Sequence, residues 1–137
     1  MLQDFVIAFD GTHMFGGAAA NTIYEMDFVN KVLIGTISSP QQVRSIAYDE
    51  AADAFWCANW DTDITLVSKA GVALNALPAA THGLLGMYGT AYDNWTSGGP
   101  YLWIFDQGAG AGMPQIIYQA NLSNLTMTGF SYDVMTD

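Results

Sequence analysis

The chain has 137 residues, of which 51% are hydrophobic and 12% charged; this is enough for one folded domain with a buried core and excludes a disordered chain. Thirteen acidic residues face three basic ones, for a formal net charge of −10. Such a chain lacks the Lys and Arg residues that neutralise phosphates, which argues against binding to nucleic acids or to anionic membranes.

The N-terminus and the single cysteine exclude several further features. Met1-Leu2-Gln3-Asp4 has no basic segment and leads into a predicted strand, so no secretion signal is expected in this chain. No apolar stretch is as long as a membrane span. Cys57 lies in an apolar run; alone, it forms neither an intramolecular disulfide nor a cysteine zinc site, and it is expected to be a small buried residue.

One phrase of Ala, an aromatic residue and Asp occurs three times along the chain. It reads Ala8-Phe9-Asp10, Ala47-Tyr48-Asp49 and Ala91-Tyr92-Asp93, so successive copies start 39 and 44 residues apart (47 − 8 and 91 − 47). A period of about 40 residues that contains several short strands is typical of a β-propeller blade.

Each repeat contains four predicted strands, rich in β-branched and aromatic residues and separated by Gly, Asp, Asn and Pro. The predicted strands are 5–9, 13–15, 22–26 and 31–37 in the first repeat, 44–48, 54–58, 64–67 and 72–77 in the second, and 87–92, 101–105, 116–120 and 125–132 in the third. No segment has a helical apolar period. The sequence therefore predicts an all-β propeller fragment, a single module over residues 1–137 with three four-stranded blades at about 4–40, 41–80 and 84–137.

The C-terminal strand has two interpretations that differ by one strand. Ser131-Tyr132-Asp133 resembles the start of a fourth repeat. However, the third repeat aligns with the first without a gap at an offset of 94, which places Gly35 on Gly129. This alignment predicts that the segment is the outer strand of the third blade.

The repeated residues have structural explanations. Small Ala residues suit the crowded inner strand of a propeller, and a bulky residue on the second strand is expected to pack between adjacent blades. The bulky residues are Phe15, Trp56 and Trp103. The repeated Asp begins a turn, where its carboxylate accepts backbone N–H bonds. Because an active-site residue is needed once and a turn in every blade, we interpret Asp10, Asp49 and Asp93 as turn residues.

With these residues in place, the chain resembles the NHL and gluconolactonase-like β-propellers. The matching stretches are Ser45-Ile46-Ala47-Tyr48-Asp49, Ala54-Phe55-Trp56, Asn59-Trp60-Asp61-Thr62-Asp63-Ile64-Thr65-Leu66 and Tyr101-Leu102-Trp103-Ile104-Phe105-Asp106. The chain looks most similar to propeller segments of large secreted bacterial proteins, which implies a secreted or cell-surface location. The resemblance implies a fold and leaves the activity open, because propellers include both enzymes and binding platforms.

This chain departs from the resemblance in two ways. Rings of these families have six or seven blades on one chain, whereas this chain has three. The lactonase-type enzymes bind a divalent metal at the ring axis through Glu, Asn and Asp. The only glutamates here, Glu25 and Glu50, do not lie on predicted inner strands. No metal ligand and no catalytic residue is therefore assigned.

Other chemistry-bearing residues favour structural roles. His13 and His82 have no Gly-x-Ser-x-Gly nucleophile motif to act with. Asp61-Thr62-Asp63 resembles part of a calcium loop but lacks the glycine and the distal glutamate of an EF-hand. Ca²⁺ at Asp61 and Asp63 is the one cofactor that the sequence leaves open.

Two tryptophans in predicted loops are the best candidates for ligand binding. Trp60 lies beside Asp61, and Trp95 lies beside Asn94. Tryptophan next to Asp or Asn is suited to stacking on sugar rings or anchoring a protein partner. The more common alternative is that each ring folds back onto a neighbouring blade.

The number of blades leads to the functional prediction. An open array of three blades exposes two blade faces, and a symmetric homodimer covers both in a six-bladed ring. A nine-bladed trimer remains open. The favoured function is a non-enzymatic interaction or scaffold module that self-associates. The alternatives are a metal-dependent lactonase-like hydrolase assembled at the dimer axis, and a glycan-binding module that uses the loop tryptophans.

Overall fold

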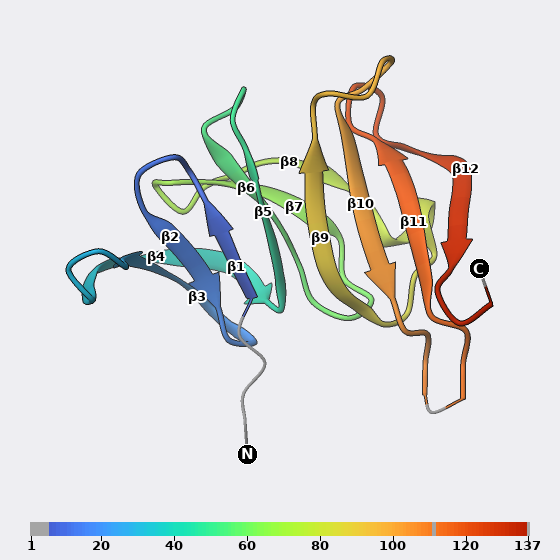
Figure 1. Cartoon of the computed structure of the whole chain (residues 1–137), viewed down its shortest axis with the longest axis horizontal. Coiled ribbons are helices and arrows are strands. Elements are labelled where there is room, and N and C mark those ends of the chain that lie inside the picture. Colours follow the sequence, from blue (N-terminus) through green and yellow to red (C-terminus); the bar gives the residue numbers. More distant parts are fainter. Residues whose placement is uncertain (1–5, 111, 137) are drawn as a thin grey trace.

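A computed structural model of the chain describes residues 6–110 and 112–136, which form three four-stranded antiparallel sheets and one short helix (Figure 1). Blade 1 contains β1 (Val6–Phe9), β2 (Met14–Gly17), β3 (Ala20–Asp27) and β4 (Val32–Val43). Blade 2 contains β5 (Ser45–Asp49), β6 (Ala54–Ala58), β7 (Ile64–Ser68) and β8 (Ala73–Leu77). Blade 3 contains β9 (Met87–Asp93), β10 (Tyr101–Asp106), β11 (Ile116–Asn121) and β12 (Thr126–Asp133). The predicted all-β class and the three four-stranded units are confirmed.

Within each sheet the strands follow chain order, so every blade is a simple antiparallel meander. The segment 126–133 pairs with β11 at the edge of blade 3, which confirms that it is an outer strand and not the start of a fourth unit. Phe5, where the first strand is predicted to begin, lies outside the described residues, as does Ala111 in the glycine-rich loop. None of the described helices is long and apolar enough to cross a membrane.

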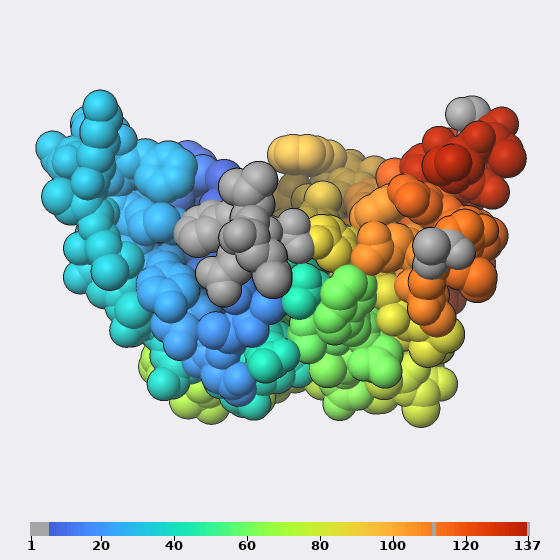
Figure 2. All heavy atoms as spheres, turned by 90° about the horizontal axis from the view of Figure 1, so that it is seen from below, coloured from blue at the N-terminus to red at the C-terminus, as the bar shows by residue number. Residues whose placement is uncertain are grey.

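The three blades lie side by side with their first strands innermost. β5 packs beside β1 on one side and beside β9 on the other, so blade 2 is the middle of the array. Figure 2 shows the same order in space: blade 1 at one end, blade 3 at the other, and blade 2 between them. The link from blade 2 to blade 3 contains the one described helix, α1 (Ala79–His82), which ends at Gly83 in the left-handed conformation (φ 65°).

The repeated aspartates form the predicted turns. In each blade the Oδ1 atom accepts two backbone N–H bonds from the residues two and three positions further on. The donors are Thr12 and His13 for Asp10 (both 2.8 Å), Ala51 and Ala52 for Asp49 (both 3.1 Å), and Trp95 and Thr96 for Asp93 (2.9 and 3.0 Å). The turn interpretation of the three aspartates is therefore confirmed.

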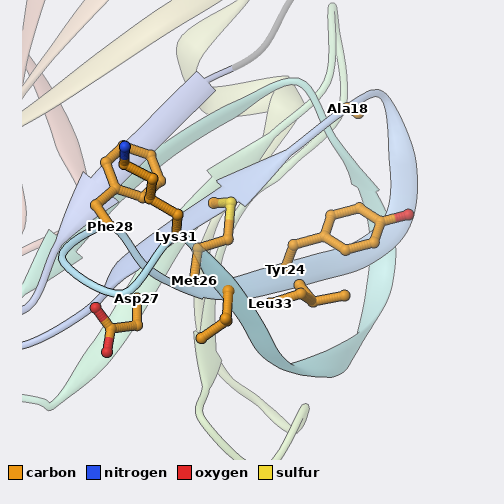
Figure 3. A pocket seen from close by; sticks show the side chains of 8 residues that line it. Ala18, Tyr24, Met26, Asp27, Phe28, Lys31 and Leu33 are labelled. Atoms are coloured by element: carbon orange, nitrogen blue, oxygen red, sulfur yellow. The ribbon is translucent and has the colours of Figure 1, made fainter.

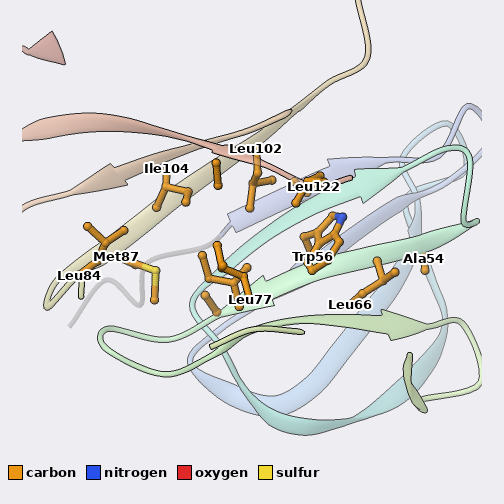
Figure 4. Close-up of a cluster of buried hydrophobic side chains, with 13 residues drawn as sticks. Ala54, Trp56, Leu66, Leu77, Leu84, Met87, Leu102, Ile104 and Leu122 are labelled. Carbon is orange, nitrogen blue, oxygen red and sulfur yellow. The ribbon is translucent and has the colours of Figure 1, made fainter. Parts of the chain in front are cut away.

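Two hydrophobic clusters hold neighbouring blades together. Phe15 of blade 1 packs with Ile46, Phe55 and Val67 of blade 2 in the first cluster. In the second cluster Trp56 packs with residues of both blades 2 and 3, including Leu102 (Figure 4). Both faces of blade 2 are thus covered, and all five residues of β6 are buried. The fully buried Cys57 lies in the first cluster, as expected.

The Ala of the repeat has a clearer role than lining an axis. Ala8, Ala47 and Ala91 lie directly opposite Phe15, Trp56 and Trp103 on the next strand. Side chains opposite each other in a sheet share a face, so a small residue leaves room for the large ring beside it. The Ala and the aromatic residue opposite it on the second strand are therefore one packing unit in each blade.

Candidate functional site

The two outward faces of the array are exposed and apolar. In β10 burial alternates strictly: Leu102 and Ile104 are fully buried against blade 2, whereas Trp103 and Phe105 point to the other side and are only partly covered. Trp103 was predicted to pack between blades, as Phe15 and Trp56 do. That prediction is wrong within this chain, because blade 3 has no following blade among the described residues.

Trp103 belongs to a file of three aromatic rings on the outward face of blade 3, here called the aromatic file. Its ring contacts Phe130 edge to face, with centroids 5.8 Å apart, and Phe130 contacts Tyr132 in the same way at 5.0 Å. Phe130 and Tyr132 are 46% and 49% exposed. Edge-to-face rings stabilise one another, so the three rings have a defined arrangement on this apolar face.

The outward face of blade 1 is apolar as well and contains a pocket of about 650 Å³, here called the blade 1 pocket. Its lining residues come from β3, β4 and the connecting turn, with one residue from the β2–β3 turn: Ala18, Tyr24, Met26, Asp27, Phe28, Lys31, Val32 and Leu33. Figure 3 shows Tyr24 and Leu33 at one end, Phe28 and Lys31 at the other, and Met26 between them. Ile7 and Phe9 on β1 are also exposed.

Equivalent positions in the middle blade are buried. Ile7 and Ile46 both precede the Ala of the repeat, yet Ile7 is 47% exposed and Ile46 only 3%. Trp56 is 2% exposed, whereas its equivalent Trp103 is partly exposed. The outward faces therefore have the composition of blade–blade interfaces without the neighbouring blade, and contiguous apolar surface of this kind marks an interaction site.

Polar contacts between the repeated aspartates and the following blade accompany the buried clusters. Between blades 1 and 2, Lys69 Nζ lies 2.8 Å from Asp10 Oδ2 and 2.6 Å from Asp53 Oδ1. Burial opposes ionisation of Asp10, but the bonds from Lys69 and from backbone N–H groups outweigh it and lower its pKa to about 2. The carboxylates in turn outweigh the burial of the Lys69 ammonium and raise its pKa.

Between blades 2 and 3 the equivalent carboxylate is Asp49. Its Oδ2 atom accepts a bond from Trp56 Nε1 at 3.0 Å. The Tyr92 hydroxyl of blade 3 also bonds to Asp49, and burial followed by the charge of this carboxylate raises the Tyr92 pKa to about 12. The Asn94 amide of blade 3 donates to Glu50 in the same turn of blade 2.

The third carboxylate, Asp93, makes its bonds within blade 3. Its Oδ2 atom accepts from Thr96 Oγ1 at 2.7 Å and from Trp103 Nε1 at 3.0 Å. These side-chain bonds, led by that from Thr96, lower the Asp93 pKa to about 2. Asp93 therefore needs no donor from a following blade.

The structure separates the two predicted ligand-binding tryptophans. The Met87 N–H at the start of β9 donates to the Trp60 carbonyl, whereas Trp95 follows the end of the same strand. They lie at opposite ends of β9 and do not form one site. Trp60 is partly buried, which agrees in part with the alternative that its ring folds back onto a neighbouring blade. Trp95 is 89% exposed.

Among the described residues, Asp61 and Asp63 are not part of a cluster of possible metal ligands. Asp61 is exposed, and Asp63 Oδ1 accepts the Ala79 N–H at the start of α1 at 2.8 Å. Within residues 6–110 and 112–136, no three His, Cys, Asp or Glu side chains gather at one place. Asp63 is therefore a residue that fixes the link to α1.

The two histidines make structural contacts. His82 is buried; its Nδ1 atom accepts the Leu84 N–H at 3.0 Å, and its Nε2 atom lies 3.1 Å from the Thr62 carbonyl. His13 Nδ1 lies 2.8 Å from Glu25 Oε1 within blade 1.

The outward faces and the blade–blade contacts were not visible as a site in the sequence. The signal that was present is the blade count, because three units of an unclosed ring require two uncovered faces. Which residues form those faces follows only from strand register.

Comparisons with known proteins support the fold. No protein-family model matches the chain, and no curated protein does. Among solved structures, hydrazine synthase of Kuenenia stuttgartiensis is similar over 91% of this chain and 34% of its own, with a TM-score of 0.62 and 12% identity. U3-55K is similar over 96% of this chain and 40% of its own, with a TM-score of 0.60 and 10% identity.

Both of these structures contain a propeller, and this chain spans less than half the length of either. At such low identity the similarity establishes the propeller-like architecture alone. An NHL or gluconolactonase family is not shown by these comparisons.

Proposed function

We propose that the chain is a non-enzymatic interaction and scaffold module that pairs with a second copy of itself to complete a six-bladed ring. The observation that carries the proposal is the pair of outward faces, which are composed like the two buried interfaces. A two-fold axis brings the aromatic file of each copy onto the blade 1 face of the other, so one contact is made twice and both faces of each copy are covered.

The repeated aspartates favour blade 1 as the neighbour of blade 3. Asp10 meets Lys69 and Asp49 meets Tyr92, so each receives a donor from the blade that follows it. Asp93 receives its donors from Thr96 and Trp103 instead. Phe9, the blade 1 counterpart of Tyr92, has no hydroxyl to donate. A phenyl ring beside a carboxylate whose bonds are already made leaves no polar group unsatisfied, which suits blade 1 of a second copy.

The test is the mass of the chain in solution, measured by light scattering over a series of concentrations. Twice the chain mass of 14.8 kDa is expected. Three times that mass would contradict a six-bladed ring. A mass of 14.8 kDa that persists on concentration would overturn self-association and leave blades of another polypeptide to cover the faces.

Matched variants assign the contact to the outward faces. Leu33→Glu places a charge in the blade 1 pocket at a residue that is 60% exposed, and Leu74→Glu places one on the middle blade at a residue that is 53% exposed. Leu33→Glu is expected to give monomers, because a buried unpaired carboxylate opposes association. Leu74→Glu is expected to keep the wild-type mass. Equal masses for the two variants would place the contact elsewhere.

The lactonase-like alternative has no observation in its favour. Glu25 contacts His13, and Glu50 contacts Asn94 in a turn, so neither glutamate lies on an inner strand where a ring axis would be lined. The glycan-binding alternative concerns Trp60, because Trp60 lines a pocket whereas Trp95 is 89% exposed.

A further inference from the structure

A second pocket, of about 460 Å³, lies near the start of β9 and is here called the Trp60 pocket. Trp95 follows the other end of the same strand. The residues that line it include Trp60, Leu85, Gln107, Met113 and Gln115. They come from the loop after β6, the link after α1 and the loop between β10 and β11. The whole pocket belongs to blades 2 and 3 of one chain, so it exists whether or not a second copy binds. Its volume is within the range of small-molecule sites.

The Trp60 side chain is held in place from several directions. The Arg44 guanidinium lies 4.3 Å from the centre of the indole ring, and the Tyr88 ring meets its edge at 5.6 Å. The backbone of Trp60 is in the left-handed region (φ 47°), where a bulky residue is strained. Its bridge to Met87 maintains that conformation. Strain that the surroundings hold in place is typical of functional positions.

The loop that carries the two glutamines is anchored at both ends. At one end the Gln107 N–H donates to the Gly86 carbonyl at 3.0 Å, and Asp106 Oδ1 accepts the Gly86 N–H at 2.6 Å. At the other end the Gln115 carbonyl accepts the Val134 N–H at 2.9 Å. A Cβ atom at position 86 would lie 2.2 Å from the Gly108 carbonyl oxygen, so only glycine permits this close approach. The backbone at both glutamines is therefore fixed before any ligand arrives.

The lining of the Trp60 pocket is uncharged, although the chain as a whole carries a net charge of −10. It combines an indole ring and two exposed apolar side chains, Leu85 and Met113, with two side-chain amides. Within the described part of the chain, the side-chain amides of Gln107 and Gln115 make no hydrogen bond. Each amide offers donors and an acceptor to a ligand.

We propose that the Trp60 pocket binds a neutral carbohydrate. The apolar C–H face of a pyranose ring suits the indole, and its hydroxyl groups both donate to and accept from the two amides. A purely apolar ligand would leave those amides without partners, and the acidic chain repels an anionic one. The proposal goes beyond ring closure and does not depend on it.

The experiment is a titration of the intact chain with cellobiose, maltose, lactose and chitobiose, followed by isothermal titration calorimetry, whose signal does not depend on Trp60. At least one sugar is expected to give a saturable change. Trp60→Ala is expected to weaken binding by about tenfold or more, as loss of a central aromatic anchor does. Trp95→Ala is the matched control: it removes a loop tryptophan at the opposite end and is expected to bind as the wild type does.

Gln115→Leu keeps the test decisive if Trp60→Ala does not fold. Gln115 is half-buried and its side-chain amide makes no hydrogen bond in the described part of the chain, so Leu, of similar size, should be tolerated there; the change removes one amide, and weaker sugar binding is expected. No binding of any of the four sugars at millimolar concentration would overturn the proposal, and so would unchanged binding by both pocket variants. Such a result leaves the solution mass unaffected, so it is distinguishable from failure of ring closure.

Discussion

The middle blade and the two end blades are built from the same repeat but have different surroundings. Ile46 and Trp56 of blade 2 are almost completely buried, whereas Ile7 of blade 1 and Trp103 of blade 3 occupy equivalent positions and are exposed in part. The difference shows that burial in this fold is decided between blades and not within a blade. A repeat of this kind carries the residues of an interface whether or not the neighbour is present.

Replacing each of the two equivalent tryptophans tests this comparison with the largest expected effect. Trp56→Ala should lower the free energy of unfolding by about 3–5 kcal/mol, because it leaves a cavity between two blades. Trp103→Ala should cost much less in dilute protein, because its ring is partly solvated there. Urea denaturation followed by circular dichroism measures both losses.

Protein concentration sharpens the same experiment. If a second copy covers Trp103, the loss caused by Trp103→Ala should grow as the protein is concentrated, because association adds to the stability of the wild type. The loss caused by Trp56→Ala should depend less on concentration. Equal losses for the two variants in dilute protein would contradict the distinction between middle and end blades.

The polar contacts between blades allow a second, smaller test. Lys69→Met removes the cation that joins Asp10 and Asp53 across the first interface. A loss of about 1 kcal/mol is expected, because Lys69 is 35% exposed and solvent screens its charge. Lys31→Met, in the blade 1 pocket, is the control and should change the unfolding free energy of dilute protein by less than about 0.5 kcal/mol.

The effect of Lys69→Met should depend on pH. The Asp10 pKa is lowered from 3.8 to about 2 in the folded chain, so its contribution is present above pH 3.8 and lost as the pH falls toward 2. The difference between the wild type and Lys69→Met should therefore shrink across that window. A difference that stays constant from pH 5 to pH 2 would mean that the ion pair does not stabilise the interface.

The strands and the aspartate turns could be predicted from the sequence because both depend on neighbours along the chain. Alternation of apolar residues predicts a strand, and an Asp that follows one accepts N–H bonds two and three residues away. The helix α1 was not predicted, because four residues are too few to show a helical period.

The contacts that join blades could not be predicted from local pattern. Lys69 and Asp10 are 59 residues apart, and nothing in the spacing of either indicates the other. The separation of Trp60 from Trp95 has a different origin. Trp60 follows β6, the second strand of its blade, and Trp95 follows β9, the first strand of its blade. Because adjacent strands of a blade are antiparallel, these two loops lie at opposite ends of the strands.

The smallest expected effect concerns the other junction, where His82 links blade 2 to blade 3. Burial lowers the His82 pKa below 6.5, and this outweighs the Thr62 carbonyl and the nearby carboxylates, which favour the charged form. Its Nδ1 atom accepts the Leu84 N–H, so protonation there breaks that bond. The unfolded chain takes up the proton first as the pH falls, so stability is present above pH 6.5 and declines below it.

Unfolding free energies measured by urea denaturation between pH 7 and 5 test this sign. The wild type should lose stability by less than the single-proton limit of about 1.4 kcal/mol per pH unit. His82→Gln should be less stable at pH 7 and show a shallower slope. If His82→Gln kept the wild-type slope, His82 would not be the titrating group. If the predicted pattern holds, the junction between blades 2 and 3 weakens in a pH range where the Lys69–Asp10 contact of the first junction remains intact.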